Sequence, residues 1–101
     1  MPLLPNHTPI LCDLLRAELK TGQIMLDLAA TERSLREEHA CRQALHKAVA
    51  ALTHVKQRVP ALRISSEQRM EFIEAARELE ARIEDFEGIL RNDRRQRLPQ
   101  G

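Results

Sequence analysis

The chain has 101 residues, of which 43% are apolar and 31% are charged, and its sixteen Lys and Arg nearly balance its fifteen Asp and Glu. A chain of this length forms one domain with a modest core, and a net charge of +1 gives no general attraction to nucleic acid or anionic lipid. Its aromatic residues are Phe72 and Phe86 alone, which excludes a base-stacking platform and disfavours a β-sandwich.

The first segment, residues 1–8, is rich in proline and contains no Lys or Arg. It therefore lacks the basic region of a secretory signal peptide, and we expect a flexible leader. Thr8 can cap a helix whose first turn begins at Pro9, because the N–H that proline lacks is not needed there. We expect this helix over residues 9–31. The apolar runs are much shorter than the ~20 residues of a membrane span.

No proline occurs between Pro9 and Pro60, so a single long helix over this segment is formally possible. The apolar positions argue against it, because those of its first and second halves fall on different faces of one straight helix. We therefore expect a kink, a turn or a change of partner within residues 30–39. Ser34 and Glu37 have the spacing of a capping box, which favours a second helix over residues 34–58.

A third helix is expected over residues 66–92. Pro60 blocks continuation of the second helix, and the stretch from Ser65 to Gln68 has the pattern of a capping box. Apolar residues then recur at alternating spacings of four and three, the heptad pattern of a helix packed against other helices. These residues are Phe72, Ala76, Leu79, Ile83, Phe86 and Leu90. Residues 93–101 are rich in Arg and predict a basic, frayed tail.

The chain is therefore predicted to be a single all-α domain over residues 1–101. If it reverses direction near residue 34, the three helices form an up-down-up three-helix bundle. If it does not, the second and third helices form an antiparallel helical hairpin from which the first helix projects. In the hairpin arrangement the first helix must bury its apolar face against another molecule, and we expect the fold to be completed by oligomerisation.

Charge is segregated along the chain. Residues 39–66 contain five Lys and Arg and no Asp or Glu, whereas residues 67–87 contain eight Asp and Glu and three Arg. A basic helix beside an acidic helix is favoured over the pairing of like with like, so we expect the second and third helices to be neighbours. The second helix has an Ala-rich face, and large side chains pack well against such a surface. We expect Phe72 and Phe86 of the third helix to fill this role.

The first helix presents an apolar face that is out of phase with the rest of the apolar pattern. We therefore expect the chain to be a non-catalytic, cytoplasmic protein–protein interaction module, such as an adaptor, escort, assembly subunit or inhibitor of a larger complex. Its partner is a protein, and a second copy of the chain in a homodimer is included. A second contact is expected from the Arg-rich tail, because an arginine cluster can dock on phosphate or on an acidic protein surface. The candidate partner-binding residues are Leu11, Leu14, Leu15, Met25, Leu26, Arg91, Arg94, Arg95 and Arg97.

Two alternatives remain open. A nucleic-acid-associated protein would use the Arg-rich tail and the basic second helix. A histidine phosphotransfer-like domain would use His46 on an exposed helical face, although the Gly that follows the Lys in such domains is missing. The histidines lack the spacing of a metal site, and Cys12 and Cys41 lack a disulfide or zinc pattern. We expect no catalytic residue, no metal, no cofactor and no membrane partner.

Overall fold

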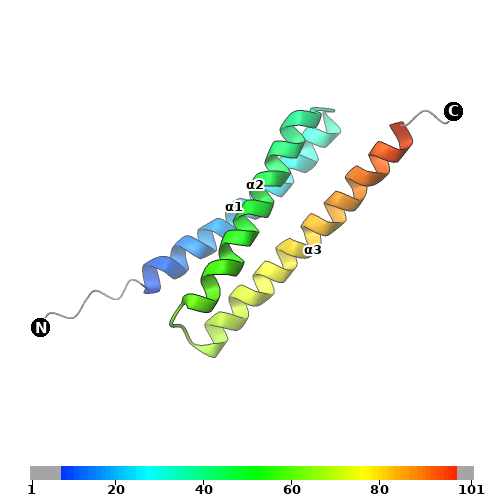
Figure 1. Ribbon diagram of the computed structural model, residues 1–101. Helices are drawn as coiled ribbons and strands as arrows, with labels where there is room; N and C mark the ends of the chain where they lie inside the picture. The colour runs from blue at the N-terminus through cyan, green and yellow to red at the C-terminus, as the bar shows by residue number, and fades with distance from the viewer. Residues whose placement is uncertain (1–7, 98–101) are drawn as a thin grey trace, which may run out of the picture.

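The computed structural model describes residues 8–97, and within them the chain forms three α-helices and no strand. The helices are α1 (Thr8–Ser34), α2 (Glu38–Arg58) and α3 (Ser66–Arg97), and a short 3-10 turn, η1 (Val59–Ala61), ends α2. They run up, down and up beside one another (Figure 1). The all-α three-helix arrangement is therefore confirmed. Most of the predicted leader (residues 1–7) and the end of the predicted tail (residues 98–101) lie outside the described residues.

The helix bounds differ from the predicted ones at four ends, and at the start of α1 the difference is one residue, Thr8 instead of Pro9. α1 extends to Ser34 and α3 to Arg97, past the predicted ends at residues 31 and 92, and α2 begins at Glu38 rather than at residue 34. The basic segment that follows residue 92 is thus helical as far as Arg97 instead of frayed. Arg and Gln are good helix formers, and Asp93 accepts two hydrogen bonds from Arg33 of α1, at 2.6 and 2.9 Å, which hold this last part of α3 against α1.

The turn between α1 and α2 forms without Gly or Pro. Arg36 adopts a φ of 61°, the left-handed conformation that usually falls to glycine after a helix. The N–H of Arg36 bonds to the carbonyl of Arg33 at 3.0 Å, and the N–H of Glu37 bonds to the carbonyl of Glu32 at 2.8 Å. These two bonds make a Schellman motif, which closes α1. The capping box predicted at Ser34 does not form, because Ser34 lies in the last turn of α1 and its hydroxyl donates to the carbonyl of Ala30.

The connection between α2 and α3 follows the sequence prediction. The Ser65 hydroxyl accepts a hydrogen bond from the N–H of Gln68 at 3.1 Å, and the Gln68 side chain accepts one from the N–H of Ser65 at 3.2 Å. This reciprocal pair is the capping box. Arg69 then donates to the carbonyls of Val59 and Leu62, at 3.2 and 3.0 Å. The guanidinium therefore fastens the start of α3 to the end of α2.

The core lies between all three helices, but α1 and α2 pack more closely together than either packs with α3. Small residues allow this approach. Ala44 and Ala48 of α2 are buried, and a Cβ built on Gly22 of α1 would lie 3.5 Å from the Cβ of Ala51 and 2.6 Å from the Cδ2 of Leu79. A side chain at position 22 would therefore displace the buried Leu79 side chain where α1, α2 and α3 meet. Phe72 and Phe86 are both buried, as the heptad pattern predicted.

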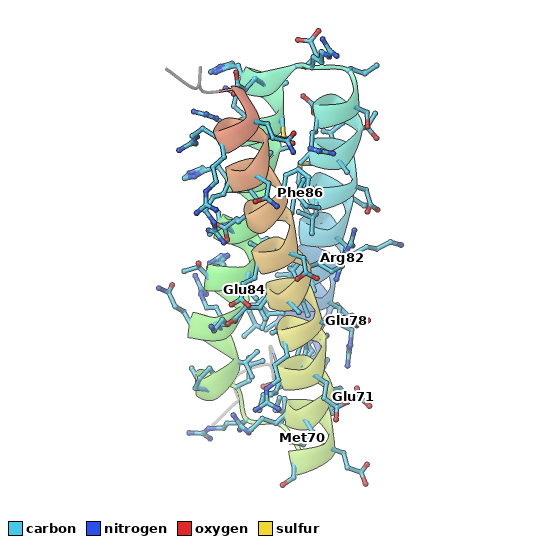
Figure 2. All side chains as sticks on the ribbon, turned by 90° about the vertical axis from the view of Figure 1, so that its right-hand side faces the viewer. Met70, Glu71, Glu78, Arg82, Glu84 and Phe86 are labelled. Atoms are coloured by element: carbon cyan, nitrogen blue, oxygen red, sulfur yellow. The ribbon has the colours of Figure 1, made fainter. Side chains whose placement is uncertain are left out.

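Ion pairs on the rim of the bundle join each helix to the others. Lys56 of α2 contacts Glu80 of α3 at 2.8 Å, which is the attraction expected between the basic and the acidic helix. Arg82 of α3 contacts Asp27 of α1 at 2.7 Å. Figure 2 shows that Arg82 lies on the side of α3 that faces α1, whereas Glu84 lies on the side of α2. Exposed pairs of this kind contribute about 0–1 kcal/mol each, so apolar packing holds the fold together.

Candidate functional site

α1 carries apolar side chains on two faces. The core face consists of Cys12, Leu15, Leu19, Gly22, Leu26 and Ala29, all buried. The other face looks into solvent and repeats at alternating spacings of four and three residues. We call it the outer seam, and its residues are Ile10, Leu14, Ala17, Thr21, Ile24 and Leu28. One apolar stripe is enough to attach a helix to a core, so the outer seam is not needed to hold α1 in the bundle.

The large side chains of the outer seam are well exposed. Ile10 and Leu14 are each 59% exposed, Ile24 is 50% exposed and Leu28 is 43% exposed. Single exposed leucines are ordinary on protein surfaces, whereas several aligned along one helix face form a continuous apolar strip. At the helical rise of 1.5 Å per residue, the outer seam runs for about 27 Å along α1. That length fits a second helix laid along it.

The outer seam has acidic flanks. Asp13, Lys20 and Asp27 follow one edge, and Glu18 and Glu32 follow the other. Three of these acids have a basic partner within the chain. Asp13 pairs with Arg16 of α1 at 3.1 Å, Asp27 pairs with Arg82 of α3, and Glu18 contacts the Nδ1 atom of His54 of α2. α3 therefore borders one edge of the outer seam and α2 borders the other.

A hollow of about 200 Å³ opens beside the first turns of the outer seam. Leu11 and Leu14 of α1 line one wall, and Arg58, Ala61 and Leu62 line the other. Leu11 is itself 37% exposed. The hollow widens the apolar surface at this end and can accept a large side chain of a helix that lies on the outer seam.

The structure divides the residues that the sequence predicted for the docking surface. Leu11 and Leu14 are exposed, and Met25 is partly buried against the core. Leu15 and Leu26 are 5% and 2% exposed. Both belong to the core, which corrects their assignment to a docking face. The physical reason is that α1 has two apolar stripes on different faces. A single mean direction for all its apolar residues points between the stripes and so mixes core residues with surface residues.

Most of the outer seam was missed by sequence reasoning. Apart from Leu14, none of its residues was among the predicted partner-binding residues. The signal was present in the sequence as the alternating spacing from Ile10 to Leu28. A second alternation, offset from the first, runs from Cys12 to Ala29. Separating the two patterns, rather than taking one mean direction, distinguishes the outer seam from the core face.

The Arg-rich end of α3 lies beside the turn between α1 and α2. Arg91, Arg94 and Arg95 are exposed, and Arg97 is the last residue of α3. Arg94 lines a small cleft of about 50 Å³ together with Arg33, Arg36, Glu38, Cys41, Arg42, Leu90 and Asp93. The hydrogen bonds to Asp93 raise the pKa of Arg33 above its ordinary value. This end of the bundle therefore gathers positive charge from all three helices.

The histidines and cysteines show no catalytic arrangement among the described residues. His39 and His46 are exposed and share a shallow hollow with Arg42, Gln43 and Lys47. Cys12 and Cys41 are buried free thiols. Burial, followed by the charge of Glu32, raises the pKa of Cys41 and disfavours its reactive thiolate form. Between residues 8 and 97, no group of three or more His, Cys, Asp and Glu is placed to hold a metal ion.

A second apolar groove lies between α2 and α3, near the loop that joins them. It encloses about 480 Å³. Val55 of α2, Val59 of η1, and Phe72 and Ile73 of α3 line it. Its rim is bridged by the Lys56–Glu80 pair. This groove lacks the repeating exposed pattern of the outer seam.

Comparison of the chain with protein-family models, with curated proteins and with solved structures finds no match. Within residues 8–97, no helix combines the length and the apolar content that crossing a bilayer requires. The fold and its surface therefore define the class of protein: a small all-helical three-helix bundle that carries an exposed apolar seam on α1.

Proposed function

We propose that this protein is a non-catalytic helical interaction module of the cytosol that docks on another protein through the outer seam of α1. Such a module serves as an adaptor, an escort, a subunit of an assembly or an inhibitor of a larger complex. The observation that carries the proposal is the outer seam itself, in which four large apolar side chains stay exposed along one helix face.

The energetics support docking at this face. Complete burial of a Leu or Ile side chain contributes about 1.5–3 kcal/mol. Since the four large side chains are about half buried already, covering them with a partner contributes on the order of 4 kcal/mol in total before the entropic cost of association. The hollow beside Leu11 and Leu14 adds a pocket for an anchoring side chain, the usual form of an interface hot spot.

Site-specific photocrosslinking tests the proposal. A photoreactive amino acid replaces Leu28 in one variant and Ile89 in another, and both full-length variants are irradiated in an extract of the cells from which the protein comes. Ile89 lies on α3 and is 42% exposed against 43% for Leu28, so the two probes are matched in exposure. We expect a discrete protein adduct from position 28 that disappears when Leu14→Gln is added. Equal adducts from both positions, or none from position 28, would contradict the proposal.

A second candidate function is binding of nucleic acid at the Arg-rich end of the bundle. The cleft shared by Arg33, Arg36, Arg42 and Arg94 supports it. Contacts to phosphate make such binding strongly dependent on salt. Replacing Arg91, Arg94 and Arg95 by Gln tests this candidate without disturbing Asp93, whose contact with Arg33 holds α3 to α1. Salt-dependent binding of DNA or RNA that the triple variant loses would favour this function over docking through α1.

A further inference from the structure

We propose that the partner of the outer seam is a helix of a different protein whose own apolar seam is flanked by Lys and Arg. This inference rests on the proposed function and specifies the chemistry of the partner. It follows from the charges at the edges of the outer seam and from the size of the residues at its centre. A second copy of the chain and a lipid surface are the two other occupants that these features must distinguish.

Parallel pairing of two copies through the outer seam places like charges together. In heptad register Leu14, Thr21 and Leu28 take one core position of a coiled coil, and Ile10, Ala17 and Ile24 take the other. Each residue on one flank of the first copy then faces the residue five positions later in the sequence of the second copy. Asp13 meets Glu18 of the second copy and Asp27 meets Glu32, so acid faces acid on both sides.

Antiparallel pairing has the same fault. The register that places Ile10 opposite Leu28 keeps the whole outer seam in contact. This register brings Asp13 opposite Asp27 of the second copy. It also brings Glu18 opposite Glu18 of the second copy, and Lys20 opposite Lys20. Like charges at these flanking positions oppose association. The outer seam is therefore unsuited to self-pairing in either direction.

A lipid surface is a poor occupant for a related reason. Amphipathic helices that lie on anionic membranes place Lys and Arg at the border of their apolar face. The outer seam has Asp13, Asp27, Glu18 and Glu32 at its borders and a single Lys20. These carboxylates would be repelled by anionic lipid, whereas they attract a partner helix with basic borders.

The centre of the outer seam adds a steric preference. Ala17 and Thr21 are small and exposed, and the large residues Leu14 and Ile24 lie on either side of them. A partner helix that fills this depression needs large apolar residues at its own centre, because large side chains pack best opposite small ones. The Arg82–Asp27 pair is 43% and 69% exposed at its two side chains, so a basic partner can share the Asp27 carboxylate.

A pair of designed peptides tests the inference on the full chain. Both have three heptads with Ile or Leu at the core positions and one Trp as a reporter, and they differ only in carrying Lys or Glu at the flanking positions. The chain has no Trp and no Tyr, so Trp emission reports the peptide alone. We expect the Lys peptide to bind at least about tenfold more tightly than the Glu peptide, a difference that one reversed set of flanking charges readily supplies.

Matched variants of the chain locate the site. Leu28→Gln is expected to weaken binding of the Lys peptide by at least about tenfold, and Ile89→Gln by less than about twofold. The double variant Asp13→Lys with Glu32→Lys is expected to reverse the preference toward the Glu peptide. Helical circular dichroism of each variant, unchanged from that of the wild type, shows that its fold is intact.

Three outcomes would overturn the inference. The first is equal or tighter binding of the Glu peptide, or no binding of either peptide to the folded chain. The second is a homodimer in sedimentation that Leu28→Gln dissociates, which would make a second copy the partner and would leave the proposed docking function standing. The third is binding to anionic vesicles that Leu28→Gln abolishes. The photocrosslinking experiment reports separately whether α1 docks on a protein at all.

Discussion

α1 and α3 run side by side in one bundle, yet their outer faces differ. Both helices bury a heptad pattern of apolar residues against the core. The remaining positions of α3 are mostly charged, with eight Asp and Glu between residues 67 and 87. α1 instead exposes a second apolar pattern, the outer seam. The contrast teaches that a helix of this bundle needs one apolar stripe to join the core, and that α1 exposes a second one which the core does not use.

The largest effect is expected on the inner face of α3. Phe86→Ala removes a ring that is 7% exposed and should lower the free energy of unfolding by about 3–5 kcal/mol. Ile89→Ala, three residues away at a position that is 42% exposed, should lower it by about 1 kcal/mol or less. Urea unfolding measures both. An unchanged midpoint for Phe86→Ala would remove α3 from the core.

The same substitution on the two faces of α1 sharpens the comparison. Leu26→Ala truncates a side chain that is 2% exposed and should cost about 2–5 kcal/mol. Leu28→Ala, two residues along the same helix, truncates a side chain that is 43% exposed and should cost about 1 kcal/mol or less. Helix propensity changes equally in both variants, so urea unfolding isolates burial. A loss at Leu28 as large as that at Leu26 would mean that the outer seam is part of the core of the isolated chain.

Two glycines, one on each helix, should respond with opposite signs. Gly22→Val on α1 forces a side chain to within 2.6 Å of the buried Leu79, and overpacking of this kind costs about 1–3 kcal/mol. Gly88→Ala on α3 meets no atom closer than 3.9 Å and should raise the stability by about 0.5–1 kcal/mol, because Ala is the better helix former. Thermal and urea unfolding of the two variants should diverge. Stabilisation by Gly22→Val would show that α1 and α3 do not meet at this position.

The smallest expected effect is at the turn that sets α1 against the rest of the bundle. Arg36→Gly relieves the left-handed conformation at φ 61° and should raise the stability by up to about 1 kcal/mol. Arg36→Ala is the control, because it removes the charge and keeps the strain. A stabilisation by Ala as large as that by Gly would assign the effect to the Arg side chain instead of to the backbone.

Local signals in the sequence predicted much of this fold. Pro60 and the Ser65–Gln68 capping box located the boundary between α2 and α3, and the spacing from Phe72 to Leu90 identified the buried face of α3. These signals depend on residues close together in the chain, so they survive without tertiary information. The turn at Arg36 was predicted only to lie somewhere within residues 30–39. The left-handed residue of this turn is an arginine, so no glycine in the sequence marks its position.

The candidate site was harder to predict, for a physical reason specific to α1. A helix with one apolar stripe has a single mean direction, and that direction points to the core. α1 has two stripes, and a single direction combined Leu15 and Leu26 of the core with Leu11 and Leu14 of the surface. Only the positions of α2 and α3 show which stripe is covered. The packing role of Gly22 was likewise not predictable, because it depends on Leu79, which lies far along the chain.

The most direct test of the outer seam is methyl NMR of the full chain during titration with the Lys peptide. We expect shifts at the methyl groups of Ile10, Leu14, Ala17, Thr21, Ile24 and Leu28, with those of Ile89 unmoved. Shifts at Val59 and Ile73 in the groove between α2 and α3, with Ile24 and Leu28 unmoved, would contradict this expectation.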